Sequence, residues 1–77
     1  MYLSVKSVVA GEDYILTVEF DNGKRGMLDM KPFLDFGVFQ KLKDRAEFER
    51  VRVAFDTIEW ESGADLDPEF VYARCRV

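Results

Sequence analysis

The chain has 77 residues, with 15 acidic and 11 basic side chains, a formal net charge of −4 and no histidine. Without histidine it lacks the commonest general base near neutral pH and the commonest transition-metal ligand. The single cysteine, Cys75, cannot form an intramolecular disulfide or a cysteine-rich zinc site, and secreted domains of this size usually carry several disulfides. We therefore expect one cytoplasmic domain over residues 1–77, with no cofactor, no metal and no membrane-spanning segment.

The first half of the chain predicts three antiparallel strands followed by short helices. Apolar and polar side chains alternate in three stretches. These stretches are residues 5–9, 14–20 and 24–29. Pro32 ends the third strand, because proline cannot donate to a ladder of backbone hydrogen bonds. A compact turn is expected over 33–37, and one or two helical turns over 38–43.

The turn between the second and third strands can be predicted from the register it imposes. A two-residue turn would place Leu16 opposite Asp29. A three-residue loop with Gly23 in the left-handed conformation would place Leu16 opposite Leu28. The match of apolar side chains favours the three-residue loop.

The second half of the chain predicts a second hairpin. Asp44 has the character of an N-cap and opens a short helix over 45–50. Alternating side chains then indicate strands over 51–55 and 58–61. We expect a tight turn at 56–57 to join them.

The end of the chain predicts a helical turn. Gly63 ends the second hairpin. Asp67 followed by Pro68 combines an N-cap acid with proline at the first helical position, which predicts a helical turn over 69–72. The alternating tail, 73–77, fits either a last edge strand or a frayed end.

The order of these elements indicates the α+β class, because runs of strands are separated by short helices. We predict a small, mainly antiparallel sheet built from two hairpins. Short helices lie between the hairpins, and a helical turn lies near the C-terminus.

Charge is unevenly distributed along the chain. Six acids and no lysine or arginine occupy residues 56–69: Asp56, Glu59, Glu61, Asp65, Asp67 and Glu69. The segment predicts either an acidic face for a basic partner or an oxygen-rich cation site. The favoured interpretation is structural, with Glu59 and Glu61 on a solvated strand face. Asp67 would then cap a helix, and Glu69 would lie in its first turn.

No catalytic, calcium-binding or nucleic-acid motif emerges. The stretch that begins at Asp65 lacks the central glycine and final acid of a calcium loop. Cys75 lies between two arginines, but no partner base accompanies it, so a plain thiol is expected. The basic residues between 41 and 52 are interrupted by acids, which argues against direct DNA or RNA binding.

The other distinctive residues have structural interpretations. Trp60 alternates with glutamates, and we assign it to the core rather than to an exposed recognition patch beside Tyr72. Gly63 is expected to adopt a positive φ, and Leu66 to anchor the loop in the core. Asp65 is expected to cap nearby backbone amides.

Several stretches together resemble the small bacterial domain-of-unknown-function family 2442. They are Val18-Glu19-Phe20-Asp21-Asn22-Gly23, Phe33-Leu34-Asp35-Phe36-Gly37 and Trp60-Glu61-Ser62-Gly63-Ala64-Asp65-Leu66-Asp67-Pro68, ending in Tyr72. The resemblance implies an α+β domain like the N-terminal domain of the Nitrosomonas protein that gave the fold its name. Some relatives add a helix-turn-helix DNA-binding domain, which we do not expect here. Others are encoded beside a small protein, as toxin–antitoxin pairs are.

The family has no established catalytic residues, so the resemblance assigns none here. Family members often have proline directly after the tryptophan, where this chain has Glu61.

We therefore hypothesise a non-enzymatic protein-interaction module that binds a neighbouring-gene protein or a second copy of itself. Its predicted contact residues are Glu61, Asp65, Asp67 and Glu69. The alternative is a small-ligand or divalent-cation binding domain that uses the acidic segment.

Overall fold

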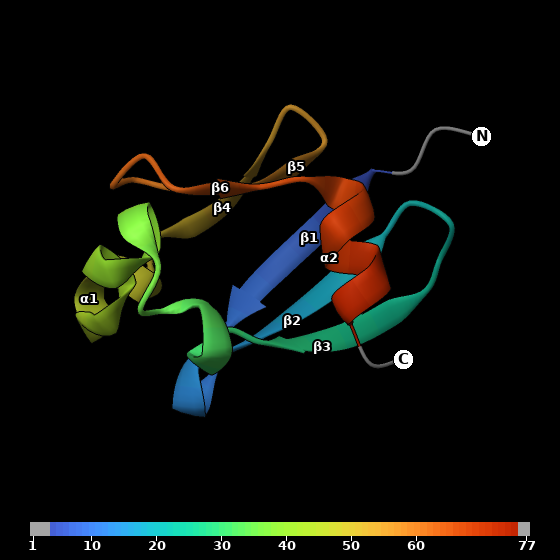
Figure 1. Ribbon diagram of the computed structural model, residues 1–77. Helices are drawn as coiled ribbons and strands as arrows, with labels where there is room; N and C mark the ends of the chain where they lie inside the picture. The colour runs from blue at the N-terminus through green and yellow to red at the C-terminus, as the bar shows by residue number, and fades with distance from the viewer. Residues whose placement is uncertain (1–3, 76–77) are drawn as a thin grey trace.

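The computed structural model describes residues 4–75 and contains two three-stranded antiparallel sheets (Figure 1). The first sheet consists of β1 (Val5–Ala10), β2 (Ile15–Phe20) and β3 (Arg25–Asp29). The second consists of β4 (Val51–Ala54), β5 (Thr57–Trp60) and β6 (Asp65–Leu66). The helices are α1 (Arg45–Phe48) and α2 (Pro68–Arg74), with 3₁₀ turns at Glu12–Tyr14, Lys31–Phe33 and Gly37–Lys43. The predicted α+β class is confirmed.

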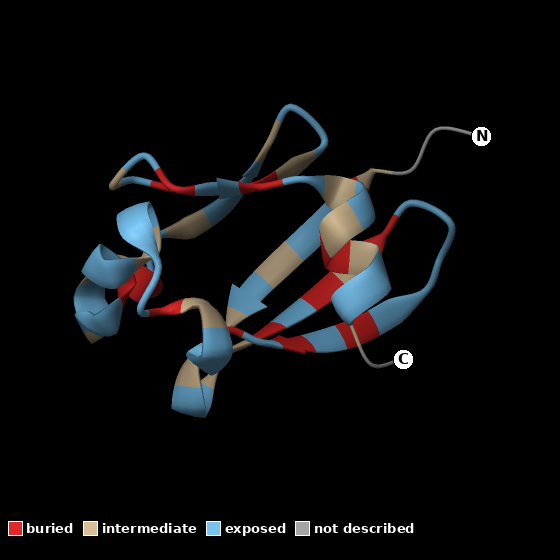
Figure 2. Cartoon of the chain, viewed as in Figure 1, coloured by how far each residue is buried: buried red, intermediate tan, exposed pale blue. Residues whose placement is uncertain are grey.

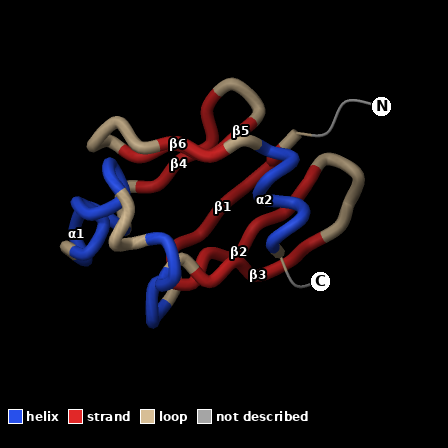
Figure 3. Tube along the Cα trace, viewed as in Figure 1, coloured by secondary structure: helices blue, strands red, loops and turns tan. Residues whose placement is uncertain are grey.

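The two sheets meet along β1, which lies against β4. The backbone N–H of Val5, at the start of β1, donates to the carbonyl of Asp56 at 2.9 Å. Figure 3 shows the two groups of strands facing each other, with the helices placed at the ends of the gap between them. Side chains from both sheets fill that gap and form the core.

The three-residue loop predicted between β2 and β3 is confirmed. Leu16 pairs with Leu28, and the Phe20 N–H donates to the Lys24 carbonyl at 2.8 Å. Gly23 has φ +87° and donates to the Phe20 carbonyl at 3.0 Å. A residue with a side chain rarely adopts this φ, so glycine is required at the third loop position.

The loop between β5 and β6 repeats the same hydrogen bonds. The Trp60 N–H donates to the Ala64 carbonyl at 2.8 Å, and Gly63 donates to the Trp60 carbonyl at 2.9 Å. Gly63 has φ +102°, which confirms the expected positive φ. The strand β6, only two residues long, was not predicted. Glu61 occupies the first position of this loop.

The core is apolar, because every residue classed as buried in the described part of the chain is apolar. Buried and exposed positions alternate along β2 and β3 (Figure 2), as the sequence pattern predicts. The ring of Phe20 packs edge-to-face on Tyr72 of α2, with centroids 4.9 Å apart. Leu66 is buried and Trp60 is only 1% exposed, so both predicted core positions are confirmed.

Both helices begin at the predicted caps. Asp44 accepts from the Ala46 N–H at 3.0 Å, and α1 is shorter than the predicted 45–50. Asp67 accepts from the Glu69 N–H at 2.8 Å, and Pro68 opens α2. This helix continues to Arg74 rather than ending near residue 72, so the edge strand proposed for the tail is wrong at 73–74. Residues 76–77 lie outside the described residues.

The turn of the second hairpin lies one residue earlier than predicted, which shifts the pairing of β4 with β5 by two residues. Phe55 and Asp56 form the turn, with φ values of +52° and +68°, and Ala54 pairs with Thr57. The predicted turn at 56–57 would have placed Phe55 opposite Ile58 within the sheet. A shift of two residues leaves every side chain on its original face, so the alternating pattern could not reveal it.

Candidate functional site

The acidic segment is partly neutralised by an arginine from a neighbouring strand. Arg52 of β4 contacts Glu59 at 2.7 Å and Glu61 at 2.8 Å. The hydrogen bonds that Arg52 donates to Glu59 and the negative charge of Glu59, with a smaller contribution from Glu61, raise the pKa of the exposed Arg52 guanidinium. The pairing of Arg52 with Glu59, and of Glu59 with Asp65, places these three residues in one row across the second sheet.

The four predicted contact residues do not form one continuous patch. Glu61 follows the end of β5, whereas Asp67 follows Leu66, which pairs with Ile58 near the other end of that strand. Asp67 caps α2, as predicted. Asp65 and Glu69 are exposed.

The predicted capping role of Asp65 is wrong, because its carboxylate accepts no hydrogen bond within the part of the chain that the structure describes. It occurs in β6, where its side chain faces solvent and the backbone is paired with β5. A sheet residue in that position has no helix N-terminus to cap.

Replacing Asp67 and Asp65 in separate variants distinguishes the helix cap from the exposed acid. Asp67→Ala is expected to lower the free energy of unfolding by about 1 kcal/mol, because the Glu69 N–H loses its acceptor. Asp65→Ala is the matched control and should stay within about 0.5 kcal/mol of the wild type. Urea unfolding followed by circular dichroism measures both. Equal losses in the two variants would contradict these assignments.

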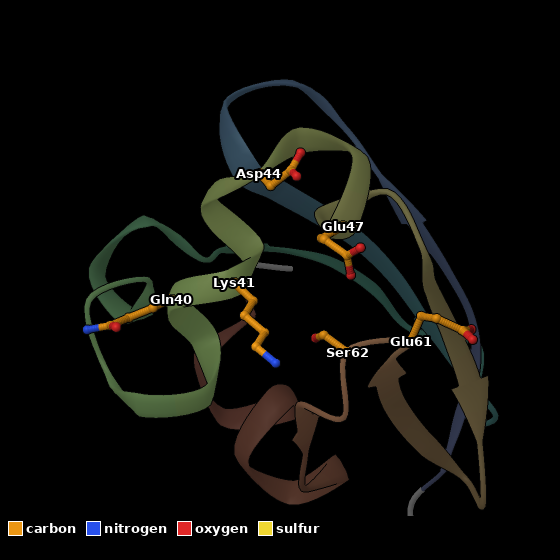
Figure 4. A pocket seen from close by; sticks show the side chains of 6 residues that line it. All are labelled: Gln40, Lys41, Asp44, Glu47, Glu61 and Ser62. Atoms are coloured by element: carbon orange, nitrogen blue, oxygen red, sulfur yellow. The ribbon is translucent and has the colours of Figure 1, made fainter.

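A polar hollow of about 590 Å³ lies between α1, the preceding 3₁₀ turn and the loop after β5. Its lining residues are Gln40, Lys41, Asp44, Glu47, Glu61 and Ser62. Figure 4 shows Lys41 and Ser62 pointing toward each other, while Gln40 and Glu61 point away. The Ser62 hydroxyl is buried and has no hydrogen-bond partner in the described structure. The hollow therefore offers the Lys41 ammonium group and the carboxylates of Asp44 and Glu47 to a polar ligand, and the Ser62 hydroxyl is buried in its wall.

The described residues contain no group of three or more carboxylate or thiol side chains placed to hold a metal ion. Within the same residues, no helix has the length and apolar character needed to cross a bilayer.

A different surface feature was missed by the sequence analysis. Phe55, at the tip of the second hairpin, is 94% exposed. Its φ of +52° lies in the left-handed region, which bulky side chains rarely occupy. Asp56 beside it also has a positive φ, and the two residues together form a type I′ turn. The packing of this domain therefore gives no reason for an aromatic side chain here.

Comparison with known proteins identifies the family. A family model described as "Protein of unknown function (DUF2442)" matches residues 5–77. The chain belongs to this family. Searches of the curated proteins and of the solved structures each found no match. The printed family description assigns no activity, so a function for this DUF2442 domain has to be argued from its own surface.

The lone cysteine of the DUF2442 domain is not activated. Partial burial raises the pKa of the Cys75 thiol, the opposite direction to that of a nucleophilic thiolate. The backbone of Cys75 continues the hydrogen bonding of α2, with its N–H donating to the Val71 carbonyl at 2.9 Å.

The raised pKa of the Cys75 thiol predicts slow alkylation. Because thiolate is the reacting form and a raised pKa reduces its population at pH 8, iodoacetamide should modify native Cys75 more slowly than the urea-unfolded chain. The difference should narrow as the pH rises through the pKa of the folded state. Mass spectrometry of timed samples measures both rates. A native rate that exceeds the unfolded rate would show that the pKa is lowered instead.

Proposed function

We propose that this DUF2442 domain is a non-enzymatic protein-interaction module whose anchor is Phe55. The exposure of this side chain carries the proposal: an aromatic ring 94% exposed at a hairpin tip contributes little to the core. Its backbone conformation is one in which an aromatic residue is disfavoured. Aromatic side chains are, by contrast, frequent energetic anchors at protein interfaces.

The charges near the tip suggest the chemistry of the partner. Asp56 is the second residue of the turn, and Asp67 lies at the end of β6 nearest to Thr57. Two carboxylates therefore lie at the end of the sheet that carries the Phe55 ring. A matching partner surface would have an apolar pocket for the ring and basic side chains around it, since opposite charges at the rim speed association.

Phe55→Asn tests this proposal with Phe36→Asn as the matched control. Phe36 is 64% exposed on a different segment, so the same chemical change is made away from the hairpin. Nuclease-treated host lysate is passed over immobilised wild type and both variants. The captured protein is then purified, and its dissociation constant is measured for each variant.

The expected result is a protein that wild type and Phe36→Asn retain and that Phe55→Asn binds at least about tenfold more weakly. Because Asn suits the left-handed conformation, loss of binding could not be attributed to unfolding. Equal affinity of all three proteins, or no protein captured by the wild type, would overturn the proposal.

Small-ligand binding is a second candidate, favoured by the unpartnered Ser62 hydroxyl beside Lys41 in the polar hollow. A ligand that binds only the folded state raises the melting temperature. Melting curves with millimolar calcium, magnesium and inorganic phosphate test it. A shift that is lost in Ser62→Ala would support the hollow as the site, whereas no shift with any probe would remove this candidate for the ions tested.

A further inference from the structure

A second hollow, mainly apolar, lies where β3 approaches the last turn of α2. Its volume is about 480 Å³, and the 3₁₀ turn Lys31–Phe33 forms part of its wall. Pockets that hold small organic groups have volumes of about 300–1,000 Å³, so this hollow can take an aromatic side chain. We call it the β3–α2 pocket. Its apolar lining consists of Ile15, Met27, Leu28, Pro32 and Phe33.

Aromatic rings and a thioether border the β3–α2 pocket. The ring of Phe33 packs edge-to-face on Phe70 of α2, with centroids 5.6 Å apart. The guanidinium of Arg74, which also lines the pocket, lies 5.8 Å from the Phe33 centroid and 5.1 Å from the Phe70 centroid. Met27 is 55% exposed. A further aromatic ring that enters the pocket therefore meets ring edges and a sulfur atom, both of which make favourable contacts with aromatic side chains.

The pocket also presents a positive charge. Within residues 4–75, Arg74 contacts the two rings and forms no ion pair. Asp29 is the acid in the lining, and the Lys31 ammonium group contacts its carboxylate at 3.1 Å. A carboxylate that arrives together with an apolar side chain can therefore pair with the Arg74 guanidinium.

The tip of the second hairpin carries both of these groups. Phe55 is 94% exposed, and the exposed Asp56 follows it in the same turn. We propose that this tip of one copy of the chain binds in the β3–α2 pocket of a second copy, with the Phe55 ring inside and the Asp56 carboxylate against Arg74. This inference rests on the proposed function, in which Phe55 is the anchor, and it identifies the partner as a second copy of this chain.

The tip and the pocket lie on opposite sides of the molecule. In Figure 1 the loop between β4 and β5 lies at the top, whereas β3 and the end of α2 lie at the bottom. A chain therefore does not fill its own pocket, and the proposed contact joins two different surfaces. A pair of chains joined by one such contact still has one free tip and one free pocket, which further contacts can fill.

Two variants that each lose one half of the contact test the proposal. Phe55→Asn removes the ring of the tip, and Arg74→Glu places a second carboxylate opposite Asp56. Sedimentation equilibrium over roughly 10 μM to 1 mM covers the dissociation constants of weak contacts. The average mass of the wild type is expected to rise with concentration over this range. Each variant alone is expected to associate at least about tenfold more weakly.

An equimolar mixture of the two variants gives the most specific result. The intact tip of Arg74→Glu fits the intact pocket of Phe55→Asn, so the mixture is expected to form 1:1 pairs with a dissociation constant within about threefold of the wild-type value. A contact between two identical surfaces would not be restored by mixing, because each pair would still contain a damaged surface.

Arg50→Glu is the matched control for the charge reversal. The side chain of Arg50 is 59% exposed and is not part of the pocket lining, so this variant should associate as the wild type does. Circular dichroism first confirms that all variants are folded. A wild type that stays monomeric, a Phe55→Asn variant that associates as the wild type does, or a mixture no more associated than its components would overturn the proposal.

These outcomes are distinguishable from a failure of the proposed function. If the purified chain is monomeric but host lysate yields a different protein whose binding requires Phe55, the interaction module stands and self-association is wrong. If neither the purified chain nor any lysate protein binds through Phe55, both proposals are wrong.

Discussion

Trp60→Ala is expected to lower the free energy of unfolding by about 3–5 kcal/mol, the range for removing a large aromatic side chain from a core. Trp60 is 1% exposed and lies between Phe39 and Phe48, with ring centroids 6.4 and 6.3 Å away. Its indole N–H also donates to the Phe48 carbonyl at 3.0 Å. The side chain therefore joins β5 to α1 through both packing and a buried hydrogen bond.

The loss is large relative to the stability of such a small domain. At roughly 0.05–0.15 kcal/mol per residue, the whole chain has about 4–12 kcal/mol. We expect Trp60→Ala to lose a quarter or more of the stability of the wild type, and to unfold at 25 °C if the wild type has only about 4–5 kcal/mol. Far-UV circular dichroism with urea measures this directly, which is necessary because the substitution removes the only tryptophan.

Two further variants separate packing from hydrogen bonding. Trp60→Phe keeps an aromatic ring but leaves the Phe48 carbonyl without its indole donor, which should cost about 1–3 kcal/mol. Phe36→Ala removes a 64% exposed ring and should change stability by no more than about 0.5 kcal/mol. A Trp60→Ala variant as stable as Phe36→Ala would contradict the assignment of Trp60 to the core.

Local signals were sufficient where the determining residues are close in sequence. The β2–β3 loop follows from matching Leu16 with Leu28 around a glycine, and the helix starts follow from Asp44 and Asp67. Each of these depends on a strong preference of one residue type at a turn or cap and on residues no more than twelve positions apart. The same holds for the core position of Trp60, which follows from strand periodicity.

Features that depend on long-range pairing were not predictable in the same way. The neutralisation of Glu59 and Glu61 by Arg52 depends on the register of β4 against β5, which the sequence pattern left open by two residues. The strand β6 is too short to show periodicity. Asp65, expected to act as a cap, instead lies in that strand. The acids of residues 56–69 are therefore close in the sequence but do not form one continuous surface.

The second large effect is expected at the β4–β5 turn, where stability should increase. Phe55→Asn combined with Asp56→Gly should raise the free energy of unfolding by about 1–2 kcal/mol, because Asn-Gly is the favoured pair in a type I′ turn and both φ values here are positive. For a domain of this size each kilocalorie per mole raises the melting temperature by about 4–8 °C. Calorimetry of the double variant measures the shift.

The control for this gain is Phe55→Ala. Alanine removes the exposed ring but keeps a Cβ atom, so it retains most of the steric cost of the left-handed conformation and should change stability little. A double variant no more stable than Phe55→Ala would show that the turn carries no such cost. If the double variant is more stable and also loses the captured partner, then Phe55 lowers the stability of the fold while supporting binding. That combination is what a binding residue at a disfavoured backbone position would produce.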